Sequence, residues 1–144
     1  MGYTTSFSGA IDLNRKLTLG EARTILEIAT DNAKAQRATG IDAHFQWVPS
    51  ETLNHIVWDG NEKFYKYIPC LIWLCKELEK WGIKANGILY YQGENVEDNG
   101  TITVIDNIVN PIPNYKNINK VPQRPLTMRG LEKMALDMVT KVKV

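Results

Sequence analysis

The sequence predicts an α+β domain in which an antiparallel sheet is packed by two main helices. Segments in which every second residue is apolar alternate with segments in which apolar residues recur every three or four positions. These are the periods of a half-buried strand and of an amphipathic helix. Turn signals separate the segments at short intervals, and neither a repeat nor a long linker divides the chain. At 144 residues it is long enough for one core, so we expect a single domain over residues 1–144.

Composition and charge exclude several classes of protein. Apolar residues make up 44% and charged residues 23%, as in ordinary globular domains, which argues against disorder and fibrous folds. The net charge of +1 gives no field that would attract nucleic acid or anionic lipid. The apolar stretches are too short to span a bilayer, and the first residues lack the pattern of a signal peptide. We therefore expect a soluble, cytoplasmic protein with neither a membrane nor a nucleic acid as partner.

The first predicted elements are a strand and a helix. Apolar residues at every second position from Ser6–Leu13 indicate a strand with one buried face. Thr18 followed by Glu21 fits a capping box, in which the two side chains each satisfy an unpaired backbone N–H. The helix that this box opens is expected to run to about Arg37, and Gly40 ends the unit.

A short hairpin and a long helix follow. Residues 44–48 and 55–58 are apolar runs bounded by Pro49 and by the Asp59-Gly60 turn, which predicts two paired strands. Asn61 can cap a helix that continues with three- and four-residue spacing to Trp81. Pro69 falls inside this helix, so we expect a bend or break near residues 65–67.

The second half predicts another hairpin, a connection and a last helix. Residues 83–93 and 101–109 are strand-like, and Asn99-Gly100 between them is a strong hairpin signal. Residues 110–126 hold four prolines and are expected to form an extended connection. Residues 127–142 form an amphipathic helix pattern. The element order predicts a ferredoxin-like βαββαβ sheet of four to five strands, with one added strand and a C-terminal helix.

The middle of the chain places large aromatic residues beside acids and amides three times. Such residues could line an apolar, hydrogen-bonding recess for a ligand, which is how small-molecule and peptide sites are built. Two other readings are a pair of tryptophans that fills the core across the hairpin, and an aromatic patch used for oligomerisation. The predicted ligand-binding residues are Trp47, Trp58, Tyr65, Tyr91, Gln92 and Glu94.

Catalytic and metal signals are weaker. His55 with Glu62 or Glu94 could supply general acid and base groups, but no known catalytic motif surrounds them. Cys70 and Cys75 lie in an apolar helical pattern and are interpreted as core residues, so we expect no metal site and no cofactor. The acidic segment 94–100 departs from the EF-hand spacing and is interpreted as a solvated loop.

Several short segments resemble a family of small proteins that is scattered through bacterial and phage genomes and has no established activity. The segments are QWVP at 46–49, WD at 58–59, EKFY at 62–65, WG at 81–82, NG at 86–87 and QGE at 92–94, with the run from 100 to 109. The resemblance covers about two thirds of the chain. Scattered occurrence implies an accessory role, such as one connected with defence, and assigns no residue a function.

These observations support three hypotheses. The first is a non-enzymatic module that binds a small molecule or a protein segment through the aromatic residues. The second is a small hydrolase or transferase that uses His55. The third is an oligomeric interaction protein, in which edge strands or the methionine-bearing terminal helix pair between copies.

Overall fold

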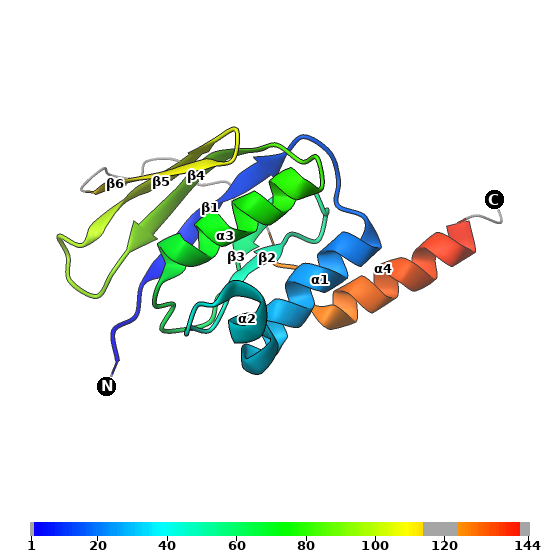
Figure 1. Cartoon of the computed structure of the whole chain (residues 1–144), viewed down its shortest axis with the longest axis horizontal. Helices are drawn as coiled ribbons and strands as arrows, with labels where there is room; N and C mark the ends of the chain where they lie inside the picture. The colour runs from blue at the N-terminus through cyan, green and yellow to red at the C-terminus, as the bar shows by residue number, and fades with distance from the viewer. Residues whose placement is uncertain (1, 114–123, 142–144) are drawn as a thin grey trace.

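The computed structural model describes residues 2–113 and 124–141, and this part of the chain has the predicted α+β fold. Six strands form one sheet in the order β2-β3-β1-β4-β5-β6, with every neighbouring pair antiparallel (Figure 1). The strands are β1 Ser6–Leu13, β2 Trp47–Pro49, β3 His55–Trp58, β4 Ala85–Gln92, β5 Asn99–Ile105 and β6 Ile108–Pro113. The helices are α1 Leu19–Thr30, α2 Asn32–Thr39, α3 Tyr67–Lys80 and α4 Met128–Lys141.

The helices cover one face of the sheet. Figure 1 shows α3 crossing β1 and β4, with α1 beside β2 and α4 along α1. The core lies between these layers, because Ile11 of β1, Leu89 of β4 and Leu74 of α3 are all fully buried. None of the described helices is long and apolar enough to cross a membrane.

The first strand and the capping box are confirmed, but the first helix is shorter than predicted. Glu21 N donates to Thr18 Oγ1 over 3.1 Å, and Thr18 N donates to Glu21 Oε1 over 2.9 Å. The helix ends at Thr30, because Asp31 adopts an extended backbone. The Asp31 carboxylate then accepts from Lys34 N and starts α2 as a separate helix. A single helix to Arg37 was therefore wrong.

The hairpin of β2 and β3 is confirmed, with Trp47 opposite Trp58, but the next helix begins later than predicted. Asn61 does not cap it and instead donates its backbone and side-chain N–H groups to Asp59. The helix begins at Tyr67, which places Pro69 in the first turn. Proline has no unfavourable effect there, since the first amides of a helix lack partners within it.

The second half contains one more strand than predicted. Asn99-Gly100 is not the hairpin turn: both residues lie in β5, opposite Gln92 and Tyr91. The run 101–109 is divided by a tight turn at Asp106 and Asn107, whose φ values are 46° and 70°. Two consecutive left-handed residues are what a two-residue hairpin turn requires. Residues 110–113 of the predicted connection therefore belong to β6, and 114–123 lie outside the described residues.

Both edges of this sheet are protected against pairing with another strand. Counted from a two-residue turn, hydrogen-bonded residue pairs alternate with non-hydrogen-bonded pairs, whose backbone groups point away from the partner strand. Val109, Pro111 and Pro113 belong to non-hydrogen-bonded pairs, so their backbone nitrogens point outward. Two of these three positions lack an N–H, a common protection of edge strands. At the other edge, Leu126 N donates to Pro49 O over 2.7 Å and Ser50 forms a bridge with Pro125. The geometry therefore argues against oligomers formed by edge pairing.

Candidate functional site

Trp47 lies in the core and not at a surface site. Its side chain has 0% exposure, and its ring contacts Phe7 and Phe64 at centroid distances of 5.0 Å each. Trp47 Nε1 donates to Tyr67 O over 2.8 Å, which satisfies its one polar group. A ligand bound at the surface cannot touch this side chain. Trp47 is therefore a core residue, as the alternative interpretation of the two tryptophans predicts.

Trp58 is only partly buried and belongs to a hydrogen-bond relay. Its Nε1 donates to Gln46 Oε1 over 2.9 Å, and Gln46 Nε2 donates to Glu62 O over 3.0 Å. Gln46 itself is fully buried, so both ends of its amide are satisfied inside the protein. The relay fixes the hairpin to the loop that precedes α3.

Gln92 and Glu94 shape the loop between β4 and β5. Gln92 Nε2 lies within hydrogen-bond distance of Gly93 O at 3.1 Å and Asn95 O at 3.0 Å. The Glu94 carboxylate accepts from Thr4 N, which holds the segment before β1 against the loop. Both side chains therefore have internal partners and position the loop.

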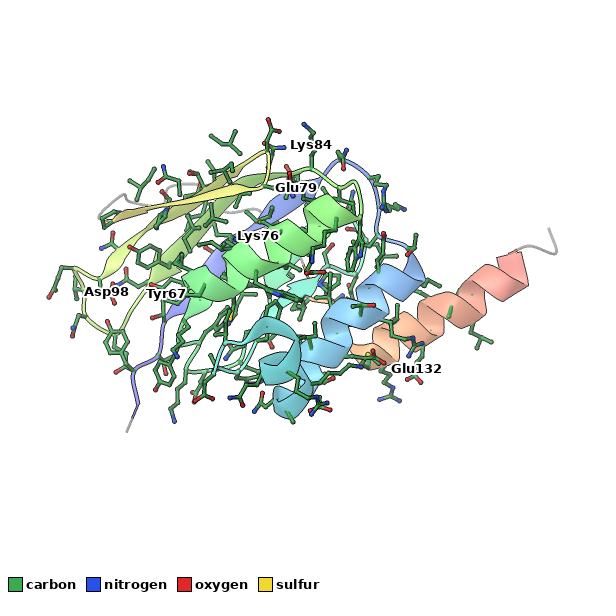
Figure 2. All side chains as sticks on the ribbon, viewed as in Figure 1. Tyr67, Lys76, Glu79, Lys84, Asp98 and Glu132 are labelled. Atoms are coloured by element: carbon green, nitrogen blue, oxygen red, sulfur yellow. The ribbon has the colours of Figure 1, made fainter. Side chains whose placement is uncertain are left out.

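Four tyrosines gather at this end of the sheet, and we call them the tyrosine cluster: Tyr3, Tyr65, Tyr67 and Tyr91. The rings of Tyr67 and Tyr91 are 6.0 Å apart, and Tyr3 N donates to Tyr65 Oη over 3.2 Å. Tyr3 Oη donates to Asp98 Oδ2 over 2.6 Å. Figure 2 shows Tyr67 at the start of α3, on the side of the loop that carries Asp98.

The structure thus joins two predicted site residues, Tyr65 and Tyr91, with Tyr3 and Tyr67, which the sequence did not predict as part of a site. Tyr67 was interpreted only as part of a helix, and its position at the first helical residue depends on where α3 begins. Tyr3 precedes β1, and its contacts with Asp98 and Asn95 span more than ninety positions. Such separations carry no local sequence signal.

The electrostatics of the cluster favour the protonated form of three of its phenols, those of Tyr3, Tyr67 and Tyr91. Burial, with the neighbouring Tyr91 and Asp98, raises the pKa of Tyr67 to about 12. Burial and Asp98 also raise the pKa of Tyr91, and the hydrogen bond to Asp98 raises that of Tyr3. The hydroxyls of Tyr67 and Tyr91 have no hydrogen-bond partner among residues 2–113 and 124–141. Two adjacent O–H donors are therefore available at partly buried positions.

Glycines allow the cluster to pack this closely. A Cβ at Gly93 would lie 2.1 Å from Asp98 Oδ2 and 2.3 Å from Tyr3 Oη. A Cβ at Gly100 would lie 2.8 Å from Tyr91 Oη. Any side chain at either position would displace a cluster member or its acid.

The loop that carries Tyr65 has an unusual backbone. Lys63 and Lys66, on either side of it, have φ values of 61° and 59°. This left-handed region is unfavourable for lysine, and such residues are often found where a site must be held in one shape. Tyr65 keeps 49% of its surface exposed, so this loop presents an aromatic ring to solvent.

His55 does not meet either of its predicted catalytic partners. Along β1, Asp12 lies opposite His55 and Ser6 lies opposite Gln92. Six residues of strand separate these positions by about 20 Å, and Glu94 lies beyond Gln92. Glu62 is bonded through its backbone to Gln46, at the other end of the β2–β3 hairpin from His55.

In the part of the chain that the structure describes, no three His, Cys, Asp or Glu side chains gather in a way that could hold a metal ion.

Comparison with models of protein families, with curated proteins and with solved structures found no match.

Proposed function

We propose that this chain is a binding module whose ligand contacts the tyrosine cluster together with Trp58, and that this binding site is non-enzymatic. The observation that carries the proposal is the pair of neighbouring rings, Tyr67 and Tyr91, whose hydroxyls have no hydrogen-bond partner within the described residues. An acceptor on a ligand would gain a hydrogen bond from either phenol, which contributes about 0.5–1.5 kcal/mol.

The chemistry of the cluster defines the kind of ligand. Tyrosine combines a large rigid contact surface with a polar tip, which suits recognition of a flat apolar group that also carries acceptors. Since the phenols of Tyr67 and Tyr91 stay protonated, each can donate a hydrogen bond to a ligand. The ligand is accordingly a small molecule or a protein segment that offers carbonyl or similar oxygens.

The predicted site residues divide into three roles under this proposal. Tyr65, Tyr91 and Trp58 contact the ligand. Gln92 and Glu94 hold the β4–β5 loop in position through the bonds described above. Trp47 supports Tyr67 from beneath, because it is buried and donates to the Tyr67 carbonyl.

Two broader expectations are part of the proposal. Four strands lie in the order β2-β3-β1-β4, and in the sequence α1 lies between β1 and β2 and α3 between β3 and β4. This arrangement supports a ferredoxin-like unit to which β5 and β6 are added. The resemblance to a family scattered through bacterial and phage genomes supports a cytoplasmic accessory role connected with defence. Plaque counts on cells that do or do not express the chain would test that role, and equal counts would contradict it.

The binding proposal can be tested with variants that remove only a hydroxyl. Small metabolites and short peptides are screened by thermal shift, and each hit is titrated against wild type, Tyr67→Phe, Tyr91→Phe and Tyr90→Phe. Tyr90 is the matched control, since it lies next to Tyr91 but faces the opposite side of the sheet. Loss of one hydrogen bond of about 0.5–1.5 kcal/mol weakens binding roughly 2- to 12-fold in the first two variants.

Two outcomes would contradict the proposal. One is a screen in which no compound or peptide raises the melting temperature of the wild type. The other is a hit whose affinity is the same for wild type and for both Tyr67→Phe and Tyr91→Phe. For any hit, Tyr90→Phe should bind with the affinity of the wild type.

A further inference from the structure

His55 lies between a carboxylate and a hydroxyl at the end of the sheet remote from the tyrosine cluster. Its Nε2 is 3.1 Å from Asp12 Oδ1, and its Nδ1 is 3.3 Å from Thr52 Oγ1. Acid, imidazole and hydroxyl in this order form the arrangement that activates a hydroxyl nucleophile in many unrelated enzymes. The arrangement is recognised by geometry and does not depend on chain order.

The fold brings these three residues together from two segments. Asp12 and His55 are direct neighbours across β1 and β3, which places their side chains on the same face of the sheet. Thr52 lies in the loop between β2 and β3, where Leu53 N donates back to Ser50 O over 3.1 Å and Leu53 has a φ of 68°. This turn places the Thr52 hydroxyl beside the imidazole three residues later.

The carboxylate selects the tautomer of His55. An ionised Asp12 can only accept a hydrogen bond, so the facing Nε2 carries the proton. Nδ1 then presents its lone pair toward Thr52 Oγ1, the orientation of a general base. The Thr52 hydroxyl donates to Asn54 Oδ1 and lies 3.0 Å from Ser50 Oγ, and rotation about its Cβ–Oγ1 bond turns its proton toward His55 Nδ1.

Two backbone amides close to this hydroxyl in the sequence are available as donors. The N–H groups of Thr52 and Asn54 donate to no residue in the ranges that the structure describes. Chymotrypsin-type serine proteases stabilise the oxyanion with backbone N–H groups that include the one of the nucleophile itself. The Thr52 amide has the same relation to its own hydroxyl.

We propose that Thr52, His55 and Asp12 form a second site, which hydrolyses small activated esters. Thr52 Oγ1 forms a bond to the ester carbonyl carbon as its proton passes to His55 Nδ1. The bond from that carbon to the leaving oxygen breaks, and the leaving group takes the proton from Nδ1. Water then attacks the acyl-threonine with the same base, which releases the acid and restores the hydroxyl.

The exposure of the three side chains limits the substrate class. Asp12 keeps 70% of its side chain exposed and His55 keeps 19%, while Thr52 lies on an exposed turn. A site so open to water has little surface with which to hold a large substrate, so a reactive leaving group must supply the driving force. Esters of phenols with short acyl groups meet this requirement.

The test uses p-nitrophenyl acetate with the full chain. Thr52→Val removes the hydroxyl while keeping the shape of the side chain, and His55→Gln removes the base. The matched control is His44→Gln, since His44 is the other histidine and its Nε2 lies 3.2 Å from a backbone carbonyl, that of Ala29. We expect a burst of p-nitrophenolate from wild type and from His44→Gln, and a roughly 100-fold slower rate from Thr52→Val and His55→Gln.

Asp12 acts through His55 and is a positioning residue. Asp12→Asn should lower kcat with little change in KM or melting temperature. Thr52→Ser keeps a hydroxyl, so it should retain the burst and carry an acetyl group on residue 52 in peptide mass spectra. This variant separates loss of chemistry from loss of folding.

Three results would overturn the proposal. The first is a wild-type rate equal to that of Thr52→Val, which would mean that His55 acts alone as an exposed imidazole. The second is an acetyl group found on lysines but not on residue 52. The third is a rate that falls equally in His44→Gln and His55→Gln.

Discussion

Replacement of Gly100 by alanine tests both the packing of the sheet and the position of the tyrosine cluster. Gly100 lies in β5 between Tyr91 of β4 and Pro113 of β6. An added Cβ would lie 2.3 Å from Ile112 O and 2.9 Å from Pro113 Cα, both of which are backbone atoms. The neighbouring strand must therefore move, because no side-chain rotation can relieve these contacts.

The expected loss of stability follows from these distances. Overpacking that forces backbone shifts is unfavourable by about 1–3 kcal/mol. For a chain of this size, that lowers the melting temperature by roughly 3–10 °C. Because the Cβ also lies 2.8 Å from Tyr91 Oη, the phenol is displaced, and any ligand of the tyrosine cluster should bind more weakly.

Urea denaturation and thermal unfolding measure the effect, with Gly20→Ala as the control. Gly20 lies in the first turn of α1, where the nearest atom to a new Cβ is Thr18 Oγ1 at 3.9 Å. The same substitution there should raise stability by about 0.5–1 kcal/mol, since alanine favours the helix. An unchanged midpoint for Gly100→Ala, or a loss in both variants, would refute the reasoning.

Three further predictions concern charge, thiols and the sheet edge. Arg15 lowers the pKa of Glu21 from its ordinary 4.5 to about 2. The ionised carboxylate therefore stabilises the fold at pH values above 4.5, and this contribution is lost as the pH falls toward 2. Glu21→Gln should therefore lower the urea midpoint at pH 7 but not at pH 2. Burial raises the pKa of Cys70 to about 11 and of Cys75 to about 12, so neither thiol should react with Ellman's reagent at pH 8 until urea unfolds the chain. Replacement of both Pro111 and Pro113 by threonine restores two outward N–H groups on β6, and light scattering should then show a larger mass than for the parent; an equal mass would contradict the edge argument.

The sequence predicted the fold best where one local pattern determined each element. Thr18 and Glu21 are three residues apart, so their capping box could be recognised directly, and the alternation in β1 was equally local. The Asn99-Gly100 signal failed because the loop from Gly93 to Asp98 is closed by other groups, including the bond from Gly93 N to Asp98 O. This left the Asn-Gly pair inside β5.

The site was predicted less well, because its contacts join distant segments. The sequence shows aromatic residues beside polar ones, but this pattern does not distinguish a buried ring from an exposed one. Trp47 and Trp58 are partners across the same hairpin, yet only Trp47 lies wholly beneath the helices. The partners of His55 were also missed, since Asp12 is brought beside it only by the pairing of β1 with β3.

The place of β1 at the centre of the sheet has a consequence for how the chain folds. This strand precedes both of its neighbours, β3 and β4, so its hydrogen bonds cannot be completed until residues through Gln92 have been synthesised. Pairings between such distant segments raise the contact order, which slows folding. During translation the backbone edges of β1 therefore stay unpaired until β3 and β4 have been made. A nascent chain with unpaired strand edges is exposed to aggregation in this interval.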